Sequence, residues 1–254
     1  MSPQQEWFLI HGLFAAEHTA GSACLDARLK RSSDFSRHAD GLGLSSYQWL
    51  DGGDRKMANR FLRRLRGTAC PVDAVEVMVF KEAELQKSLG SDAGRDCWQK
   101  VAGLQLTDFD MTRSFVLMGQ PLRLLEGEGG RQKILWFGNG LEHLSQAEFI
   151  EHYTTGHGPL VTRHATVIGL RNYLQVPSRQ CELADHLREL GLGRASPPAV
   201  FAQLEMAAPA FKLSSILARR SATREIKVDE QRHIDFSHSM LLLSGSFGLG
   251  TAGN

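Results

Sequence analysis

The chain repeats itself, and this repeat constrains its fold more than any other feature of the sequence. Six identical residues recur in an eleven-residue frame displaced by 126 positions: Arg37, His38, Ala39, Gly43, Leu44 and Tyr47, then Arg163, His164, Ala165, Gly169, Leu170 and Tyr173. A weaker match relates 110–115 to 235–240 at a displacement of 125. Both displacements are close to half of the 254 residues, so the sequence predicts a tandem duplication with repeats at 1–128 and 129–254. The acidic, glycine-rich segment 126–130 is expected to link them.

Each half shows the same order of predicted elements. Short apolar runs predict strands at 7–10, 44–50, 75–80 and 115–118 in the first half, and at 133–137, 170–176, 200–206 and 240–243 in the second. Helices are expected over 24–38, from a capping-box pattern at Ser145–Glu148, and from 210 onward. The order β-α-β-β-α-β is that of a ferredoxin-like α+β unit. In both halves a polar segment, 51–71 or 177–198, separates the middle strands and is expected to hold a short amphipathic helix.

Composition excludes several classes of protein. The net charge is +1 and the pI is about 7.8, without the basic excess of a dedicated nucleic-acid binder. No apolar run approaches the roughly 20 residues that a membrane span requires. Four dispersed cysteines and the lack of a signal-peptide pattern favour a reduced, cytoplasmic protein. We therefore expect a soluble chain with no nucleic-acid or membrane partner.

The second half resembles the EthD family of the dimeric α+β barrel superfamily. The resemblance rests on the helix motif at 144–160, on the Gly169-Leu170-x-x-Tyr173 strand, and on the tail from Asp229-Glu230 to Ser239. It covers most of residues 131–245, with Tyr153 where the family usually has Trp. The resemblance implies two ferredoxin-like repeats packed sheet to sheet, here as an intrachain pseudo-dimeric barrel, with a ligand cavity between helix and sheet. It also implies isomerase-, cyclase-, dehydratase- or decarboxylase-type chemistry, mostly without cofactors.

The first half departs further from this pattern. Arg31 stands at the position matching His157, and no Gly-Pro pair follows it. We expect the first repeat to keep the fold and to have lost or changed the site.

His157 is the leading candidate for catalysis. It shares one helical face with Phe149, Tyr153 and Leu160, so it is expected to point toward the sheet, although Gly156 and Pro159 should distort the helix near this point. Imidazole exchanges protons near neutral pH, so His157 is a candidate general acid/base. The alternative is a core histidine bonded to a backbone carbonyl. Tyr153, one turn earlier, is either its helper or a packing residue.

Other residues are weaker candidates for substrate binding. Phe149 lies on the face of His157, whereas Tyr173 has a twin in Tyr47 that favours a structural role. Glu205 is either a base on a half-buried strand or a solvent-facing carboxylate, and His238 and His233 lie near the last strand. Asp235 is expected to cap local backbone amides.

The sequence predicts no metal and no organic cofactor. In a regular helix His152 and His157 would lie about 140° apart, and His157 and His164 about 10 Å apart along the axis, so neither pair suits one ion. No HExxH motif is present. A single axial histidine would suffice for haem, which leaves that cofactor as an alternative. The basic segment 55–66 is either the solvated face of an amphipathic helix or a lid that attracts an anionic substrate.

Taken together, these features favour a cofactor-independent lyase- or isomerase-type enzyme of aromatic compound catabolism. It would act on a small, hydrophobic, aromatic or lactone-like catabolite by histidine acid/base chemistry. The alternatives are a non-catalytic small-molecule-binding accessory protein and a haem-dependent monooxygenase relative. A homodimer of such pseudo-dimeric chains is possible within this scheme.

Overall fold

The computed structural model describes residues 5–16, 21–51, 70–103, 108–130, 132–207 and 213–245. The chain divides into two compact units. Unit 1 takes the described residues of 1–52, 71–122 and 176–201, and unit 2 takes those of 53–70, 123–175 and 202–254. The basic segment at 55–66 lies outside the described residues. None of the helices in the described ranges has the length and apolar character that a bilayer crossing needs.

Unit 1 contains a four-stranded antiparallel sheet in the order β2-β4-β1-β5. Its strands are β1 (Glu6–Leu13), β2 (Leu44–Asp51), β4 (Ala74–Lys81) and β5 (Phe115–Gly119). Its helices are α1 (Gly21–Leu42), α3 (Glu82–Gly90), α4 (Asp92–Gly103) and α8 (Glu182–Glu189). Helix α8 confirms the helix expected in the segment 177–198, and it contributes Leu183, Ala184 and Leu187 to the core of this unit.

Both faces of the unit 1 sheet carry buried side chains. Along β1, Leu9 lies in the cluster that packs on Phe35 of α1 and Trp98 of α4, while the opposite face presents Phe8 and Ile10. Strand β4 is buried at nearly every position. Strands that bury alternate residues on both sides require a covering layer on each face of the sheet.

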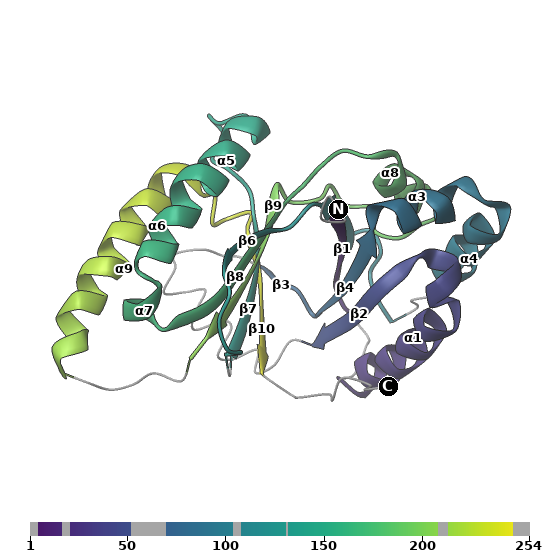
Figure 1. Cartoon of the computed structure of the whole chain (residues 1–254), viewed down its shortest axis with the longest axis horizontal. Coiled ribbons are helices and arrows are strands. Elements are labelled where there is room, and N and C mark those ends of the chain that lie inside the picture. The colour runs from purple at the N-terminus through teal and green to yellow at the C-terminus, as the bar shows by residue number, and fades with distance from the viewer. Residues whose placement is uncertain are drawn as a thin grey trace. The chain divides into compact units, whose positions relative to one another are not determined.

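Unit 2 contains a six-stranded sheet in the order β3-β10-β7-β9-β8-β6. Its strands are β3 (Cys70–Pro71), β6 (Leu122–Leu125), β7 (Gln132–Gly138), β8 (Leu170–Pro177), β9 (Val200–Met206) and β10 (Met240–Gly245). The helical elements are α5 (Gln146–His152), the π-helix η1 (Tyr153–His157), α6 (Gly158–Arg163), α7 (Ala165–Ile168) and α9 (Leu213–His233). Figure 1 shows α5, α6, α7 and α9 together on one side of this sheet.

The two sheets confirm the predicted fold class, an α+β chain with a ferredoxin-like unit in each half. Numbered within its own half, each set of four main strands has the spatial order 4-1-3-2, which places the first and third strands at the centre. In unit 2 the small strands β3 and β6 extend the two edges. The central strands β7 and β9 carry the apolar runs that the sequence predicts, because central strands are buried most completely.

Candidate functional site

The helix that carries His157 begins and distorts where the sequence predicts. The Ser145 hydroxyl accepts from the Glu148 amide at 3.2 Å, and the Glu148 carboxylate accepts from the Ser145 amide at 2.8 Å, which completes the capping box. The α-helix then gives way to the π-helix η1, where the Gly158 amide donates to the Tyr153 carbonyl five residues back. Pro159, which has no amide hydrogen, follows at once.

The π-helix changes which histidines share a face. In a π-helix, residues five apart replace residues four apart as hydrogen-bonded neighbours. His152 and His157 therefore both reach a single carboxylate on α9: Asp229 Oδ1 lies 3.0 Å from His152 Nε2, and Oδ2 lies 2.8 Å from His157 Nδ1. The angle of about 140° expected between these two side chains in a regular helix is wrong for this segment.

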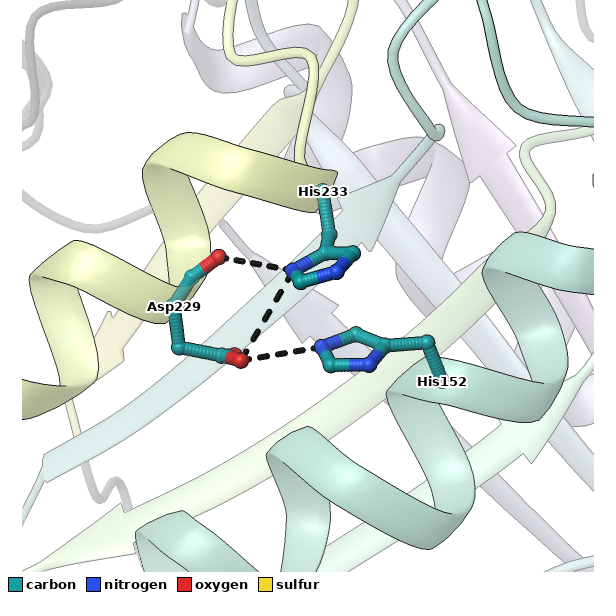
Figure 2. A group of neighbouring side chains, drawn as sticks. All are labelled: His152, Asp229 and His233. Carbon is teal, nitrogen blue, oxygen red and sulfur yellow. Dashed lines mark hydrogen bonds and ion pairs between the residues drawn. The ribbon is translucent and has the colours of Figure 1, made fainter.

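A third histidine completes the cluster around Asp229. His233 lies one turn later on α9, and its Nδ1 donates to the Asp229 carbonyl at 2.9 Å and lies 3.6 Å from Oδ1. Its ring stacks on that of His152, with centroids 3.4 Å apart and planes inclined by 17°. Figure 2 shows both rings turned toward the same carboxylate, one from α5 and one from α9.

Aromatic side chains line the other side of His157. The Tyr153 ring stacks on His157 with centroids 4.8 Å apart, and also on Trp136 of β7 at 5.1 Å. Phe149 packs at 5.6 Å from Tyr153 and is fully buried. The Tyr173 hydroxyl of β8 lies 3.4 Å from that of Tyr153.

The direction of the hydroxyl protons follows from Gln175. Its side-chain amide donates to the Tyr173 oxygen at 2.7 Å, so the Tyr173 proton is directed to the Tyr153 oxygen. This leaves the Tyr153 hydroxyl proton free to be donated elsewhere. Burial raises the pKa of Tyr153 well above its ordinary value, and burial raises that of Tyr173 to about 12, so both hydroxyls are neutral near pH 7.

The pKa values of two adjacent carboxylates on α9, Asp229 and Glu230, are shifted in opposite directions. Burial alone would raise the pKa of Asp229, but the hydrogen bond from His157 and the charges of the three histidines outweigh it and lower that pKa. Burial raises the pKa of Glu230 from 4.5 to about 7, and the Asp229 charge adds to this, although His157 opposes it. Near pH 7 Asp229 is thus an anion, while Glu230 holds a proton part of the time. Pairs of groups separated in this way are typical of acid/base sites.

Four of the predicted site residues lie together: His157, Tyr153, Phe149 and Tyr173. Glu205 lies elsewhere, where it pairs with Lys133 at 3.2 Å and accepts from Asn172 at 2.8 Å and from the Gly130 amide at 3.2 Å. These bonds hold the segment between the repeats against the sheet, and Asn172 and Lys133 lower the pKa of Glu205 against the effect of burial.

His238 also lies apart from the cluster. Its side chain is 77% exposed and lies 2.6 Å from Asp235. Asp235 accepts from the backbone amides of Ser237 and His238, the local capping that the sequence predicts. His164 pairs with Glu225 at 2.9 Å, also outside the cluster.

Sequence reasoning missed the residues of α9. The sequence indicated Asp229 and Glu230 only as part of the tail that resembles the EthD family. It did not indicate that either residue contacts His157. The available signal was the spacing of Asp229 and His233, four residues apart on one helical face. His152 was missed because its direction depends on the π-helix.

Unit 1 contains a buried polar cluster of its own. Glu76 of β4 is fully buried, lies 2.7 Å from His11 Nδ1 of β1 and accepts from the Tyr47 hydroxyl of β2 at 2.9 Å. The Nε2 atom of His11 is buried and has no hydrogen-bond partner within the described residues. Tyr47, the twin of Tyr173, therefore also joins a polar network, but one with a different composition.

Comparison with known proteins yields structural similarity only. No protein-family model and no curated protein sequence matches the chain. A chlorite dismutase from Candidatus Nitrospira defluvii is 10% identical over 96% of this chain and 92% of its own, with a TM-score of 0.46. A proposed monooxygenase from Fusobacterium nucleatum is 9% identical over 99% of this chain and 100% of its own, with a TM-score of 0.46. A heme-binding protein from Thermus thermophilus is 12% identical over 95% of this chain and 91% of its own, with a TM-score of 0.41.

Proposed function

We propose that this chain is a cofactor-independent enzyme of lyase or isomerase type that moves a proton on a small aromatic or lactone-like compound. The observation that carries the proposal is the hydrogen-bonded pair of a buried His157 and a partly exposed Asp229, beside aromatic rings and a second titratable carboxylate. An ionised Asp229 that accepts from Nδ1 of His157 fixes one tautomer of the imidazole. The lone pair is then on Nε2, which makes no hydrogen bond with any of the described residues.

His157 has the role of general base and then of general acid. Nε2 takes a proton from the substrate, for example from a carbon beside a carbonyl group, and Asp229 stabilises the imidazolium that forms. Returning that proton to another atom completes an isomerisation, and returning it to a leaving group completes an elimination. Asp229 acts through His157 and is a positioning residue.

Tyr153 and Glu230 suit the charge that develops on the substrate. The free hydroxyl proton of Tyr153, backed by Tyr173 and Gln175, is available to an oxygen that gains negative charge. Glu230, with its pKa raised to about 7 by burial, is the second group able to give or take a proton at neutral pH. Phe149 and Trp136 pack on Tyr153 and hold its ring beside His157.

We also propose that the chain is an EthD-like member of the dimeric α+β barrel superfamily, with repeats 1–128 and 129–254 forming an intrachain pseudo-dimer. The sequence repeat and the matching 4-1-3-2 sheets support this proposal. The unit 1 sheet, buried on both faces, is what a barrel-forming sheet requires. The same proposal includes a homodimer, in which two such pseudo-dimeric chains associate.

The test is exchange of substrate hydrogen for deuterium. The protein is incubated in D₂O with a panel of small aromatic ketones and lactones, and mass spectrometry follows both deuterium incorporation and conversion. We expect the native chain to act on at least one compound, and His157→Ala to lower that rate by about 10²–10⁴-fold, the usual contribution of a general acid/base. Asp229→Asn should lower the rate and displace its pH profile, because it disturbs the tautomer of His157.

His164→Gln is the matched control, because His164 lies in the same helical segment but binds Glu225 outside the cluster. Unchanged turnover in His157→Ala would overturn the assignment. A compound that binds and is recovered unaltered would instead support the non-catalytic binding protein.

A haem-dependent monooxygenase is the competing function, because an imidazole nitrogen that makes no hydrogen bond within the described residues, as Nε2 of His157 does, is also a haem ligand. A Soret band that forms when haem is added to the native chain, and that His157→Ala abolishes, would favour it over the cofactor-free reaction.

A further inference from the structure

We propose that His152, Asp229 and His233 form a binding site for a divalent transition-metal ion of the zinc class. The ligand atoms are His152 Nε2, Asp229 Oδ1 and His233 Nδ1 (Figure 2). One ligand atom from each of the three residues lies within 4.8 Å of the other two. The proposal goes beyond the proposed function: the ion would bind Oδ1 of Asp229, whereas His157 contacts Oδ2 of the same carboxylate.

The separations of the ligand atoms suit a tetrahedral ion. Bonds of about 2.0–2.1 Å place the ligand atoms of a tetrahedral zinc site about 3.3–3.4 Å apart. Oδ1 lies 3.0 Å from His152 Nε2 and 3.6 Å from His233 Nδ1, so the two distances bracket that value. The carboxylate therefore needs little movement to accept an ion in place of its present contacts.

The kind of ion follows from the donors. Two imidazoles and one carboxylate are ligands for zinc, copper, nickel and cobalt, whereas magnesium prefers oxygen ligands and keeps its waters. Three protein ligands leave the fourth position of a tetrahedral ion to water. An ion can reach the site from solvent, because the side chains of His152 and His233 are 26% and 25% exposed and that of Asp229 is 17% exposed.

Metal binding requires the two rings to splay. The rings are nearly parallel, so an ion lying in the plane of both forces them apart at the ends that face away from Asp229. Nδ1 of His233 must also give up its hydrogen bond to the Asp229 carbonyl. The partial exposure of both rings provides room for this rotation.

The experiment is titration of the untagged, chelator-treated full chain with Co²⁺, followed by its visible absorption and by calorimetry. We expect one equivalent to bind with the intense bands of tetrahedral cobalt, Zn²⁺ to displace it, and Mg²⁺ to leave it in place. His152→Gln and His233→Gln should each weaken binding by more than the ~10–100-fold that follows loss of an outer-shell partner. His143→Gln, at an exposed histidine of the same unit, is the matched control and should bind Co²⁺ normally.

Far-UV circular dichroism establishes whether each variant is folded. Absence of a tetrahedral spectrum in the native chain overturns the proposal. So does binding that survives in both folded variants, because the ion would then lie elsewhere. Neither result depends on turnover, so the metal site and the acid/base function stand or fall separately.

Discussion

Replacement of Glu230 by Gln should stabilise the protein at alkaline pH and leave it unchanged in acid. Burial raises the pKa of this carboxyl from 4.5 to about 7 in the folded chain. At 1.36 kcal/mol per pKa unit, that rise corresponds to about 3 kcal/mol. Gln has nearly the same shape and never ionises, so Glu230→Gln removes the cost of charging the buried group.

The sign of the effect follows from the two protonation states. Below about pH 4.5 the carboxyl is neutral in both the folded and the unfolded chain, so it costs nothing. Between about pH 4.5 and 7 the unfolded chain ionises while the folded chain holds its proton, so the stability of the native protein falls as pH rises. Above about pH 7 both forms are ionised and the full cost is present. The advantage of Glu230→Gln should therefore grow from near zero at pH 4.5 to about 3 kcal/mol at pH 8.

The assay is thermal unfolding followed by circular dichroism between pH 4.5 and 8.5. For a chain of this size, about 3 kcal/mol corresponds to about 6–12 °C in the unfolding midpoint. Glu151→Gln, at an exposed carboxylate of α5, is the matched control and should show no such trend. A difference between Glu230→Gln and the native chain that is constant with pH would refute the reasoning.

Substitutions at three further positions test the structure itself by urea unfolding. Glu76→Ala should cost about 1–3 kcal/mol for each buried partner that it leaves unsatisfied, His11 and Tyr47, and Glu76→Gln should cost less; equal costs would mean that these hydrogen bonds add nothing. Phe149→Ala should cost about 3–5 kcal/mol through the cavity left by a fully buried ring. Ser145→Ala should cost about 1 kcal/mol by removing the capping box of α5, and a neutral result would mean that this cap adds nothing.

The order of elements was predictable because its signals are local. A capping box and short apolar runs each report on a few neighbouring residues; the structure confirms the strands predicted in both halves and the cap at Ser145. Gly156 and Pro159 correctly predicted a distortion. They could not predict its form, because glycine and proline at these positions are compatible with either a π-helix or a kink.

Only the part of the candidate site that lies on the helical segment 146–157 was predictable from the sequence. His157, Tyr153 and Phe149 follow from the spacing along one helix, but whether they act on a substrate awaits the exchange experiment. The carboxylate that orients His157 lies 72 positions later, on a helix whose rotation no local pattern fixes. An error of one residue in the predicted rotation of α9 would place Glu230 where Asp229 lies. The pKa of Asp229 is lowered from its ordinary value, whereas that of Glu230 is raised.

The two polar clusters show what distinguishes a structural pair from a candidate site in two units with the same strand order. Each joins a histidine to a carboxylate, and each includes one tyrosine of the twin pair Tyr47 and Tyr173. In unit 1, His11 and Glu76 are both almost fully buried on neighbouring strands, so proton exchange with solvent requires the sheet to open. In unit 2 the carboxylate lies on a helix and is partly exposed, so protons and ions can reach Asp229 without unfolding. The expectation that the first repeat changed its site is thus best tested by access: imidazole hydrogen exchange should be slow at His11 and fast at His152.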